Sequence, residues 1–357
     1  MAPVRRGLVA IVVLLAFVFL LRSSSSASSD SRDTHSSERP VQVPPRVRTH
    51  AGRQQSAQFF IEDIADRPLR ERLRYQYPYD IDAKFPAFIW QTWKDVPSSS
   101  WFPDELRPSE ESWSQLHPGF VHEVLGDKTA EHLIRYLYSS VPEVVEAYES
   151  LPVPVLKADL FRYLILLARG GVYSDIDTEA LQPAIDWLPK DLDPLSVGLV
   201  VGIEADPDRP DWHDWYSRRI QFCQWTIQSK PGHPILRDVV ATIVEDTLRM
   251  KREGILTMAR MDKSIVEFTG PAVWTDAVFR YFNNEDYFQN EKSRNVTYED
   301  FTGQTTQKKV GDVVVLPITS FSPGVGQMGA EEPDHPMAFV RHDFGGTWKP
   351  ANERYIG

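Results

Sequence analysis

Two aspartates, Asp175 and Asp177, are separated by one residue and follow shortly after the pair Gly170-Gly171. Alternate side chains of an extended chain point to the same face, so Tyr173, Asp175 and Asp177 are predicted to share one face. Carboxylates that project together beyond a strand form a hard oxygen site, which suits Mn²⁺ or Mg²⁺ with water or a diphosphate as further ligands. The spacing therefore predicts a divalent-metal site.

A second charged pair, Asp159 and Arg162, lies three residues apart on a helix predicted over residues 155–168. This helix is apolar on nearly every side, which predicts that it is buried. Burying both charges costs free energy unless they pair with each other or meet a ligand. Without any function, Asp159 and Arg162 would be a structural ion pair, and Asp175 and Asp177 would belong to an ordinary acidic turn. Their proximity to Gly170-Gly171 favours one functional site.

Short apolar runs alternate with helical patterns around these residues, which predicts a layered α/β fold with a mainly parallel sheet. In such folds, ligands lie beyond the carboxyl ends of the strands. The expected strands cover residues 87–90, 120–124, 172–177, 197–203 and 313–316, and the expected helices cover residues 130–138 and 155–168.

Composition limits the classes of partner. The chain has 357 residues, with 39 Lys and Arg against 50 Asp and Glu, for a formal net charge of −11. Sequence-independent binding to nucleic acid needs a basic surface, so we expect no nucleic-acid partner. The single cysteine, Cys223, excludes an intrachain disulfide and any zinc site built from several cysteines.

The N-terminal region has the pattern of a membrane-targeting segment followed by a stem. Residues 1–6 are predicted to be a cytoplasmic tail, because Arg5 and Arg6 favour that side, and residues 7–21 a signal-anchor transmembrane helix. A cleaved signal peptide is the alternative, but Arg22 lies in what would be the cleavage region. Residues 22–56 are Ser- and Pro-rich and predict a flexible stem. Residues 57–84 predict a helical stem or neck, and residues 85–357 a lumenal catalytic domain.

Three tryptophans, Trp212, Trp215 and Trp225, lie in or near an acidic segment at residues 204–214. Aromatic faces beside carboxylates would suit a sugar acceptor. Core tryptophans beside a solvated acidic loop would give the same pattern. The sequence leaves both interpretations open.

The run from Val155 to Thr178 closely resembles the DXD glycosyltransferases of the Och1-like family, which are fungal Golgi α-1,6-mannosyltransferases of the initiation-specific type in glycosyltransferase family 32. The resemblance extends from about Phe85 to Lys349, almost the whole region predicted to be compact. The other matching stretches are residues 85–94, 202–212, 218–234, 269–271 and 342–349.

The resemblance implies a GT-A fold, in which a Rossmann-like sheet is flanked by helices. It also implies a retaining enzyme that moves mannose from GDP-mannose to a high-mannose N-glycan in α-1,6 linkage. The enzyme would be a single-pass type II protein of the Golgi membrane that initiates outer-chain elongation. Three alternatives remain: a paralogue acting on a mannan chain or inositol sphingolipid, a non-catalytic subunit of a mannosyltransferase complex, and a metal-dependent hydrolase.

Site residues are carried over by position from the resemblance. Asp175 and Asp177 would be the catalytic pair and, with His342, the ligands of Mn²⁺, for which Mg²⁺ is the substitute. Asp175 would also contact the ribose, and Asp177 would connect the metal to the diphosphate. Glu267 is a candidate nucleophile or base that nothing in the sequence distinguishes from a surface residue. The implied donor-binding residues are Gln91, Trp93, Asp159, Arg162, Gly171, Tyr173 and Asp175.

Overall fold

This computed structural model describes residues 64–288 and 294–345. All of them fall in a compact unit that comprises Gly52–Gly357. The predicted tail, anchor and stem (residues 1–56) and the start of the predicted neck lie outside the described residues. Within the two described ranges, no helix combines the length and the apolar character needed to cross a membrane.

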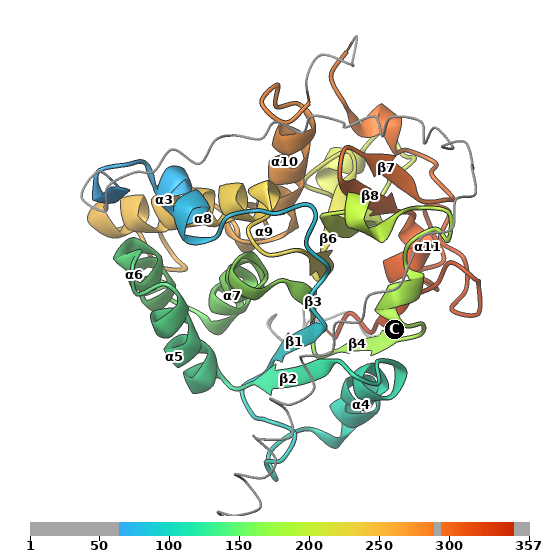
Figure 1. Ribbon diagram of the computed structural model, residues 1–357, viewed down its shortest axis with the longest axis horizontal. Helices are drawn as coiled ribbons and strands as arrows, with labels where there is room; N and C mark the ends of the chain where they lie inside the picture. The colour runs from blue at the N-terminus through green and yellow to red at the C-terminus, as the bar shows by residue number, and fades with distance from the viewer. Residues whose placement is uncertain (1–63, 289–293, 346–357) are drawn as a thin grey trace, which may run out of the picture. The chain divides into compact units, whose positions relative to one another are not determined.

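A seven-stranded sheet forms the centre of the described region, with strand order β2-β1-β3-β6-β5-β8-β7 (Figure 1). A separate two-stranded sheet pairs β4 with β9. The strands are β1 (Phe88–Thr92), β2 (Val121–Leu125), β3 (Gly171–Ser174), β4 (Thr178–Ala180), β5 (Leu199–Ala205), β6 (Gln221–Ser229), β7 (Lys308–Val310), β8 (Val313–Leu316) and β9 (Val340–His342).

Strand direction explains why the sheet is mixed. Strands β1, β2, β3, β5 and β8 point one way, while β6 and β7 are antiparallel to their neighbours. The prediction of a mainly parallel sheet is confirmed in the sense that five of the seven strands share a direction. Because β6 runs backwards between β3 and β5, it begins at the edge where those two strands end.

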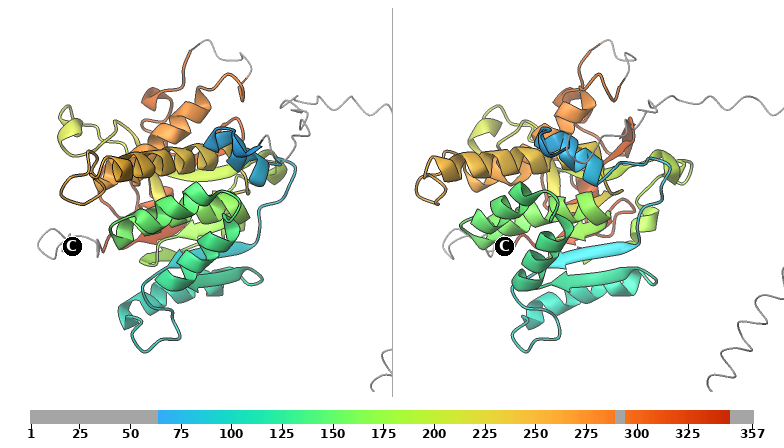
Figure 2. Two further views of the ribbon diagram at one scale, coloured as in Figure 1. Left: turned by 90° about the vertical axis from the view of Figure 1, so that its left-hand side faces the viewer. Right: turned by 60° about the vertical axis from the view of Figure 1, so that its left-hand side comes forward.

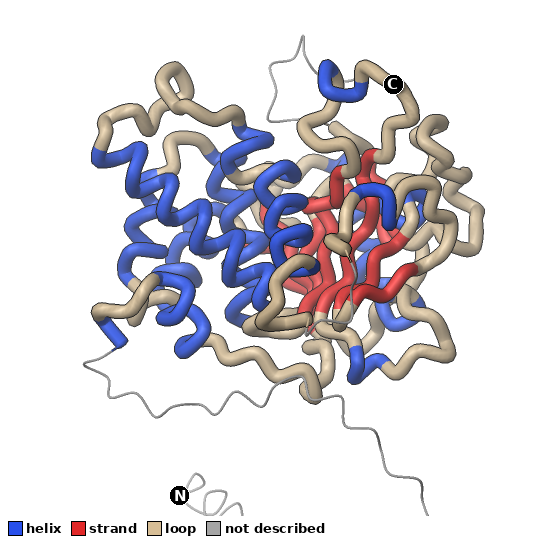
Figure 3. Tube along the Cα trace, turned by 90° about the horizontal axis from the view of Figure 1, so that it is seen from above, coloured by secondary structure: helices blue, strands red, loops and turns tan. Residues whose placement is uncertain are grey.

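Helices cover both faces of the sheet unequally. Helices α5 to α8 gather on one side, and α4 and α11 lie on the other with the β4–β9 pair (Figures 1 and 3). The helices are α3 (Leu69–Gln76), α4 (Arg107–Leu116), α5 (Asp127–Leu137), α6 (Pro142–Ser150), α7 (Pro154–Arg169), α8 (Pro234–Arg252), α9 (Ile265–Phe268), α10 (Pro271–Phe282) and α11 (Ile318–Phe321). Short 3-10 turns cover Asp104–Leu106, Ala184–Asp186, Pro194–Ser196, Trp212–Asp214 and Tyr298–Asp300.

Helix α7 is the buried helix that the sequence predicts. Pro154 occupies the first helical turn, where its missing N–H costs nothing, and Gly170 ends the helix with a φ of 64°. Ten of its residues are buried, including Asp159 and Arg162. Helix α7 therefore carries two charged side chains through the core and ends directly before β3.

Gly171 begins β3 with a φ of 98°, and a Cβ added there would lie 2.6 Å from the carbonyl oxygen of Phe88. Only glycine fits where β3 passes this close to β1. The extended segment predicted over residues 172–177 is shorter than expected. Strand β3 ends at Ser174, and Asp177 lies in the turn that leads to β4.

The second half of the predicted neck packs on the helical layer. Leu69 and Leu73 of α3 are buried in the main core. Arg70 Nε donates to Asp238 Oδ1 on α8 at 2.8 Å. Figure 2 shows α3, in blue, lying along α8. The described part of the neck thus contributes to the same core as the sheet, while the boundary at residue 85 stays a prediction.

A buried carboxylate connects the neck to distant parts of the chain. Asp312, in the turn between β7 and β8, accepts a hydrogen bond from Tyr281 of α10 at 2.7 Å and another from Tyr79. His233, at the start of α8, lies 3.5 Å from the same carboxylate. Asp312 therefore joins three segments that are far apart in the sequence.

Candidate metal and donor site

The turn between β3 and β4 holds both aspartates of the motif at the carboxyl edge of the sheet. The backbone N–H of Asp175 donates to the carbonyl of Trp225 at 2.8 Å. Inside the turn, Ser174 Oγ lies 2.7 Å from both Thr178 Oγ1 and Thr226 Oγ1. These buried hydroxyls fix the turn to β6, so the two carboxylates project from a rigid base.

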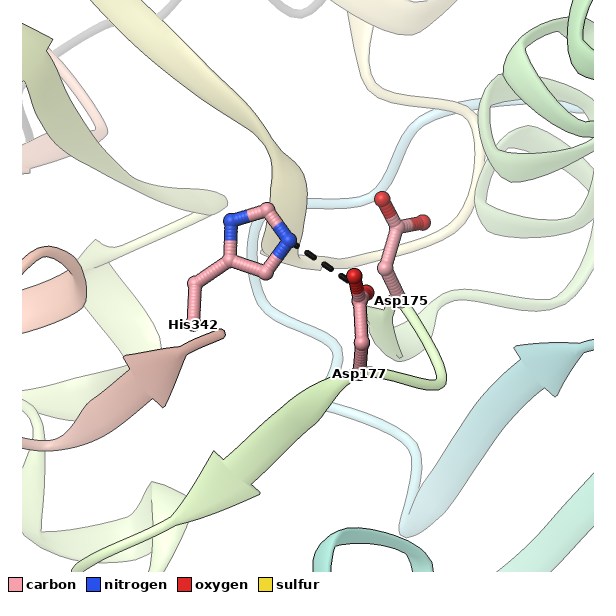
Figure 4. A group of neighbouring side chains, drawn as sticks. All are labelled: Asp175, Asp177 and His342. Atoms are coloured by element: carbon pink, nitrogen blue, oxygen red, sulfur yellow. Dashed lines mark ion pairs between the residues drawn. The ribbon is translucent and has the colours of Figure 1, made fainter. Parts of the chain in front are cut away.

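His342 reaches this turn from the far end of the chain. Strand β9 pairs antiparallel with β4, and His342 is the partner of Thr178. Its Nε2 lies 3.3 Å from Asp177 Oδ1. Figure 4 shows the imidazole facing Asp177, with Asp175 beside it. One ligand atom from each of Asp175, Asp177 and His342 lies within 4.8 Å of the others, so the predicted ligand trio is brought together.

The charges of Asp177 and His342 stabilise each other. Burial alone would raise the pKa of Asp177, but the nearby His342 and hydrogen bonds outweigh it and hold that pKa below its usual value. Burial would lower the pKa of His342, yet the Asp177 carboxylate raises it. The Asp177 carboxylate and the His342 imidazole thus each favour the charged form of the other.

Arg162 joins α7 to the same turn. Its Nη1 lies 2.7 Å from Asp159 Oδ1, and its Nη2 donates to Asp175 Oδ1 at 2.9 Å. Tyr173 also donates its hydroxyl to Asp175 Oδ1 at 2.9 Å. Burial raises the pKa of Asp175, and Arg162 opposes that rise. Asp175 is therefore fixed in orientation by Arg162 and Tyr173, with only 26% of its side chain exposed.

Sequence reasoning did not assign roles to the residues that hold Asp159. Thr269 Oγ1 donates to Asp159 Oδ2 at 2.7 Å, and Gln224 Nε2 lies 3.3 Å from Oδ1. Tyr163 donates its hydroxyl to Gln224 Oε1 at 2.7 Å. The signal that could have found Thr269 is the Thr-Gly-Pro run before α10, in which the proline opens the helix and the threonine precedes it.

Gln91, near the end of β1, is buried and holds the turn from the other side. Its Nε2 donates to the carbonyl of Asp175 at 3.0 Å, and its Oε1 lies 2.8 Å from His122 Nε2. Burial lowers the pKa of His122 to about 4, so His122 is neutral and donates from Nε2. Trp93 follows β1, and its buried indole N–H has no hydrogen-bond partner among the described residues. A polar ligand at this edge could accept that hydrogen bond.

Two candidates lie apart from this group. Gly171 begins β3, at the opposite end of the strand from Asp175, and its observed contact is with Phe88 of β1. Glu267 lies on α9 and forms an ion pair with Arg218, whose Nη1 is 2.8 Å from Glu267 Oε1. The same guanidinium lies 2.6 Å from Asp276. Glu267 is thus partnered by Arg218 and shares it with a second carboxylate.

The ligand set fits a divalent metal ion. Two carboxylates and one imidazole offer oxygen and nitrogen donors of the kind that Mn²⁺ and Mg²⁺ accept. The lowered pKa of Asp177 keeps it ionised, as a ligand must be. Arg162 offsets part of the negative charge through the other side of Asp175.

Comparison with known proteins agrees with this geometry. Residues 103–193, which include the acidic turn, match the family model described as "Glycosyltransferase sugar-binding region containing DXD motif". The chain is 43% identical to the initiation-specific alpha-1,6-mannosyltransferase of Candida albicans, over 95% of this chain and 92% of that protein.

Two further fungal relatives match most of the chain. The protein of the same name from Schizosaccharomyces pombe is 44% identical, over 78% of this chain and 67% of its own length. The putative glycosyltransferase HOC1 of Saccharomyces cerevisiae is 42% identical, over 81% and 72%. The chain therefore belongs to the family of fungal initiation-specific alpha-1,6-mannosyltransferases, within the DXD-containing glycosyltransferases.

Proposed function

We propose that this protein is a retaining mannosyltransferase that moves mannose from GDP-mannose to a high-mannose N-glycan core in α-1,6 linkage. The observation that carries the proposal is the trio Asp175, Asp177 and His342, held at the carboxyl edge of the sheet in a member of this family. The proposal includes the GT-A class of fold, which the mixed sheet and the acidic turn after β3 support.

The donor would lie across the edge formed by β1 and β3. Gln91 fixes the backbone of Asp175, and the unpartnered N–H of Trp93 would bind the base or ribose. Arg162 and Tyr173 orient Asp175, which would meet the ribose and the hydration shell of the metal. Asp159, held by Thr269, would keep Arg162 in place on the side of the sugar.

Asp177, with His342 and Asp175, would hold Mn²⁺, for which Mg²⁺ is the substitute. When bound, the ion would supply positive charge where the departing GDP becomes more negative. His342 must lose its proton before it can act as a ligand, because only the neutral imidazole coordinates. Asp177 and Asp175 then carry the negative charge that keeps the cation in the site.

The cellular setting is part of the proposal. Residues 7–21 would anchor the protein in the Golgi membrane as a single-pass type II protein, with the described region in the lumen. N-glycans on glycoproteins would meet the site there, and the enzyme could work inside a larger glycosyltransferase complex. Fractionation of cells expressing the full chain tests the location. Release of the protein by alkaline carbonate alone would argue against the anchor.

The decisive experiment measures GDP release by the chain from residue 56 onward. A panel of nucleotide sugars is supplied with and without Mn²⁺, and with and without a high-mannose N-glycan. We expect release from GDP-mannose only, dependence on Mn²⁺, and acceleration by the glycan, with the linkage then read from the product. If the folded protein releases no GDP from any nucleotide sugar, the non-catalytic subunit is favoured. If GDP release is equal with and without the glycan, a hydrolase is favoured. Transfer to a different acceptor would favour a paralogous activity.

A further inference from the structure

Besides Gln228 Oε1 near the far end of β6, four buried polar atoms on β5, β6 and β9 have no hydrogen-bond partner among the described residues. They are Glu204 Oε2, Gln221 Oε1, Trp225 Nε1 and His342 Nδ1. Gln221 and Trp225 are each only 5% exposed. Leaving a buried polar group unpaired costs about 1–3 kcal/mol, so such a group is normally satisfied by a ligand or by water.

The four side chains are neighbours. The Trp225 and His342 rings lie 4.7 Å apart between centroids. A hydrogen bond from Gln221 and the charge of His342 both act on the carboxyl group of Glu204. Trp225 belongs to the core cluster that also contains Val340 of β9. The unpaired atoms therefore form one cluster, in which His342 is also a proposed metal ligand.

Within this cluster, Glu204 and Gln221 lie away from the proposed donor residues, whereas His342 belongs to the proposed metal site. Glu204 lies at the carboxyl end of β5, and Gln221 begins β6 beside it, where Ala205 pairs with Gln221. The donor residues proposed above lie on β1, β3 and α7, on the other side of β6 in the sheet order. A substrate that meets the mannosyl group from the side of β5 would be the acceptor.

The chemistry of the cluster suits sugar hydroxyls. It offers carbonyl and carboxylate oxygens that accept hydrogen bonds and an indole N–H that donates one, and each hydroxyl can do both. A phosphate would meet the negative charge of Glu204.

We propose that Glu204, Gln221 and Trp225 form the acceptor subsite, in which Glu204 Oε2 accepts a hydrogen bond from the attacking hydroxyl of the acceptor mannose. This inference rests on the proposed function for the identity of the acceptor. Gln221 positions the Glu204 carboxyl, and the Trp225 N–H binds a second hydroxyl of the same sugar. The subsite thus selects and orients the hydroxyl that receives the mannosyl group.

The test measures binding, so it does not depend on turnover. A trimannoside and its analogue without the accepting 6-hydroxyl are titrated calorimetrically into the full-length chain in detergent, with GDP and Mn²⁺ present. We expect the analogue to bind about tenfold more weakly than the trimannoside to the unmodified protein. In Glu204→Gln the affinity for the trimannoside should fall about tenfold and the affinity for the analogue should change little. The two ligands should then bind with nearly equal affinity.

The control is Asp208→Asn, which removes one negative charge from an exposed position in the loop that follows β5. It should change the affinity for neither the trimannoside nor its analogue. Glu204→Asp, with its carboxylate kept, should recover part of the discrimination if Glu204→Gln folds poorly. An unchanged ratio between the two ligands in a folded Glu204 variant would overturn the proposal. So would a loss of GDP-mannose affinity with trimannoside binding intact, since the subsite would then belong to the donor.

The two proposals fail in different ways. Trimannoside binding that depends on Glu204, without any transfer from GDP-mannose, would overturn the proposed function and leave the subsite standing. If Glu204→Gln changes neither the transfer from GDP-mannose nor the affinity for the trimannoside, the subsite is overturned and the proposed function stands. Absence of trimannoside binding to the unmodified protein would overturn the subsite.

Discussion

At the scale of single residues, one guanidinium determines the orientation of the motif. Arg162 lies between Asp159 and Asp175 with only 4% of its side chain exposed, and it also lies over the Tyr173 ring at 5.2 Å. A planar fork can serve two carboxylates at once, which a lysine ammonium on a flexible stem does poorly. The identity of this residue therefore matters beyond its charge.

Arg162→Lys should lower kcat/KM for the donor by at least about tenfold, because Asp175 loses its fixed partner. The variant should also melt at a lower temperature, with a loss of about 1–3 kcal/mol in the free energy of unfolding, since one buried carboxylate is left without a cation. Steady-state kinetics and thermal melting measure the two effects. Arg209→Lys, in an exposed ion pair with Asp211, is the control. Unchanged donor kinetics would remove Arg162 from the site.

Asp177→Asn tests the metal ligand. Activity that depends on Mn²⁺ should fall about 100-fold or more, and Mn²⁺ should no longer raise the melting temperature, because ligand binding to the folded state is what stabilises it. In chelator the melting temperature should fall only modestly, because asparagine keeps an oxygen facing His342 but loses the charge that pairs with the imidazole.

The matched control for Asp177→Asn is Glu179→Gln. Glu179 lies on β4, two residues after Asp177, and pairs with Arg341 of β9 at 2.6 Å, so it is a nearby carboxylate with a basic partner that does not belong to the trio. Its Mn²⁺ response should match that of the unmodified protein. Collapse of the Asp177 variant in chelator would assign that carboxylate a structural role.

At the scale of elements, the close approach of β3 to β1 controls where the acidic turn lies. Gly171→Ala should lower the free energy of unfolding by at least about 2 kcal/mol, because its Cβ would press on Phe88 in addition to the cost of a positive φ. Gly119 has a φ of 95°, and a Cβ added there would meet no atom within 4 Å. Gly119→Ala therefore measures the cost of the positive φ without a steric clash. Equal losses in the two variants, by denaturant unfolding, would contradict the steric explanation.

The sequence predicted the elements with a strong local pattern. Helix α7 is apolar along its length, and the strand expected over residues 313–316 has the observed bounds of β8. Strand β6 was not predicted, since Gln221, Gln224 and Gln228 interrupt its apolar run. The Gln224 side chain is hydrogen-bonded to Tyr163 and Asp159, which belong to another part of the chain. Such tertiary pairing leaves no local signal.

The candidate site shows the same division. Asp175 and Asp177 follow from their spacing, and Arg162 from its unexpected charge on an apolar helix. His342 was expected only through family resemblance, because the β4–β9 pairing that delivers it joins segments far apart in the sequence. The sequence placed Glu204 only at the start of an acidic segment, residues 204–214, and left open whether that segment binds a sugar acceptor or is a solvated loop.

At the scale of the whole molecule, Asp312 connects the neck, α8 and α10. Burial would raise its pKa, but His233 and the hydroxyls of Tyr79 and Tyr281 outweigh that effect and hold the pKa well below its usual range. A carboxylate whose pKa is lowered on folding stabilises the protein above its unfolded pKa of about 3.9. That stabilisation is lost as the pH falls towards the lowered folded pKa.

Asp312→Asn should therefore melt at a lower temperature than the unmodified protein at pH 7, and the gap should narrow between pH 5 and pH 3 as the unmodified protein loses this contribution. Thermal melting across that range measures the gap. Asp104→Asn, whose side chain is 94% exposed, should show no such convergence. A gap independent of pH would mean that the carboxylate acts through packing and not through its charge.

The reversed direction of β6 also has an evolutionary consequence. Because β5 ends and β6 begins at the same edge, residues 206–220 leave and re-enter the sheet between paired backbones, at Ala205 and Gln221. A segment anchored in this way can change in length and sequence at little cost to the strands. Under the acceptor subsite proposed above, changes in residues 206–220 would alter the surroundings of Glu204 and Gln221, which border this segment, while β5 and β6 keep their pairing.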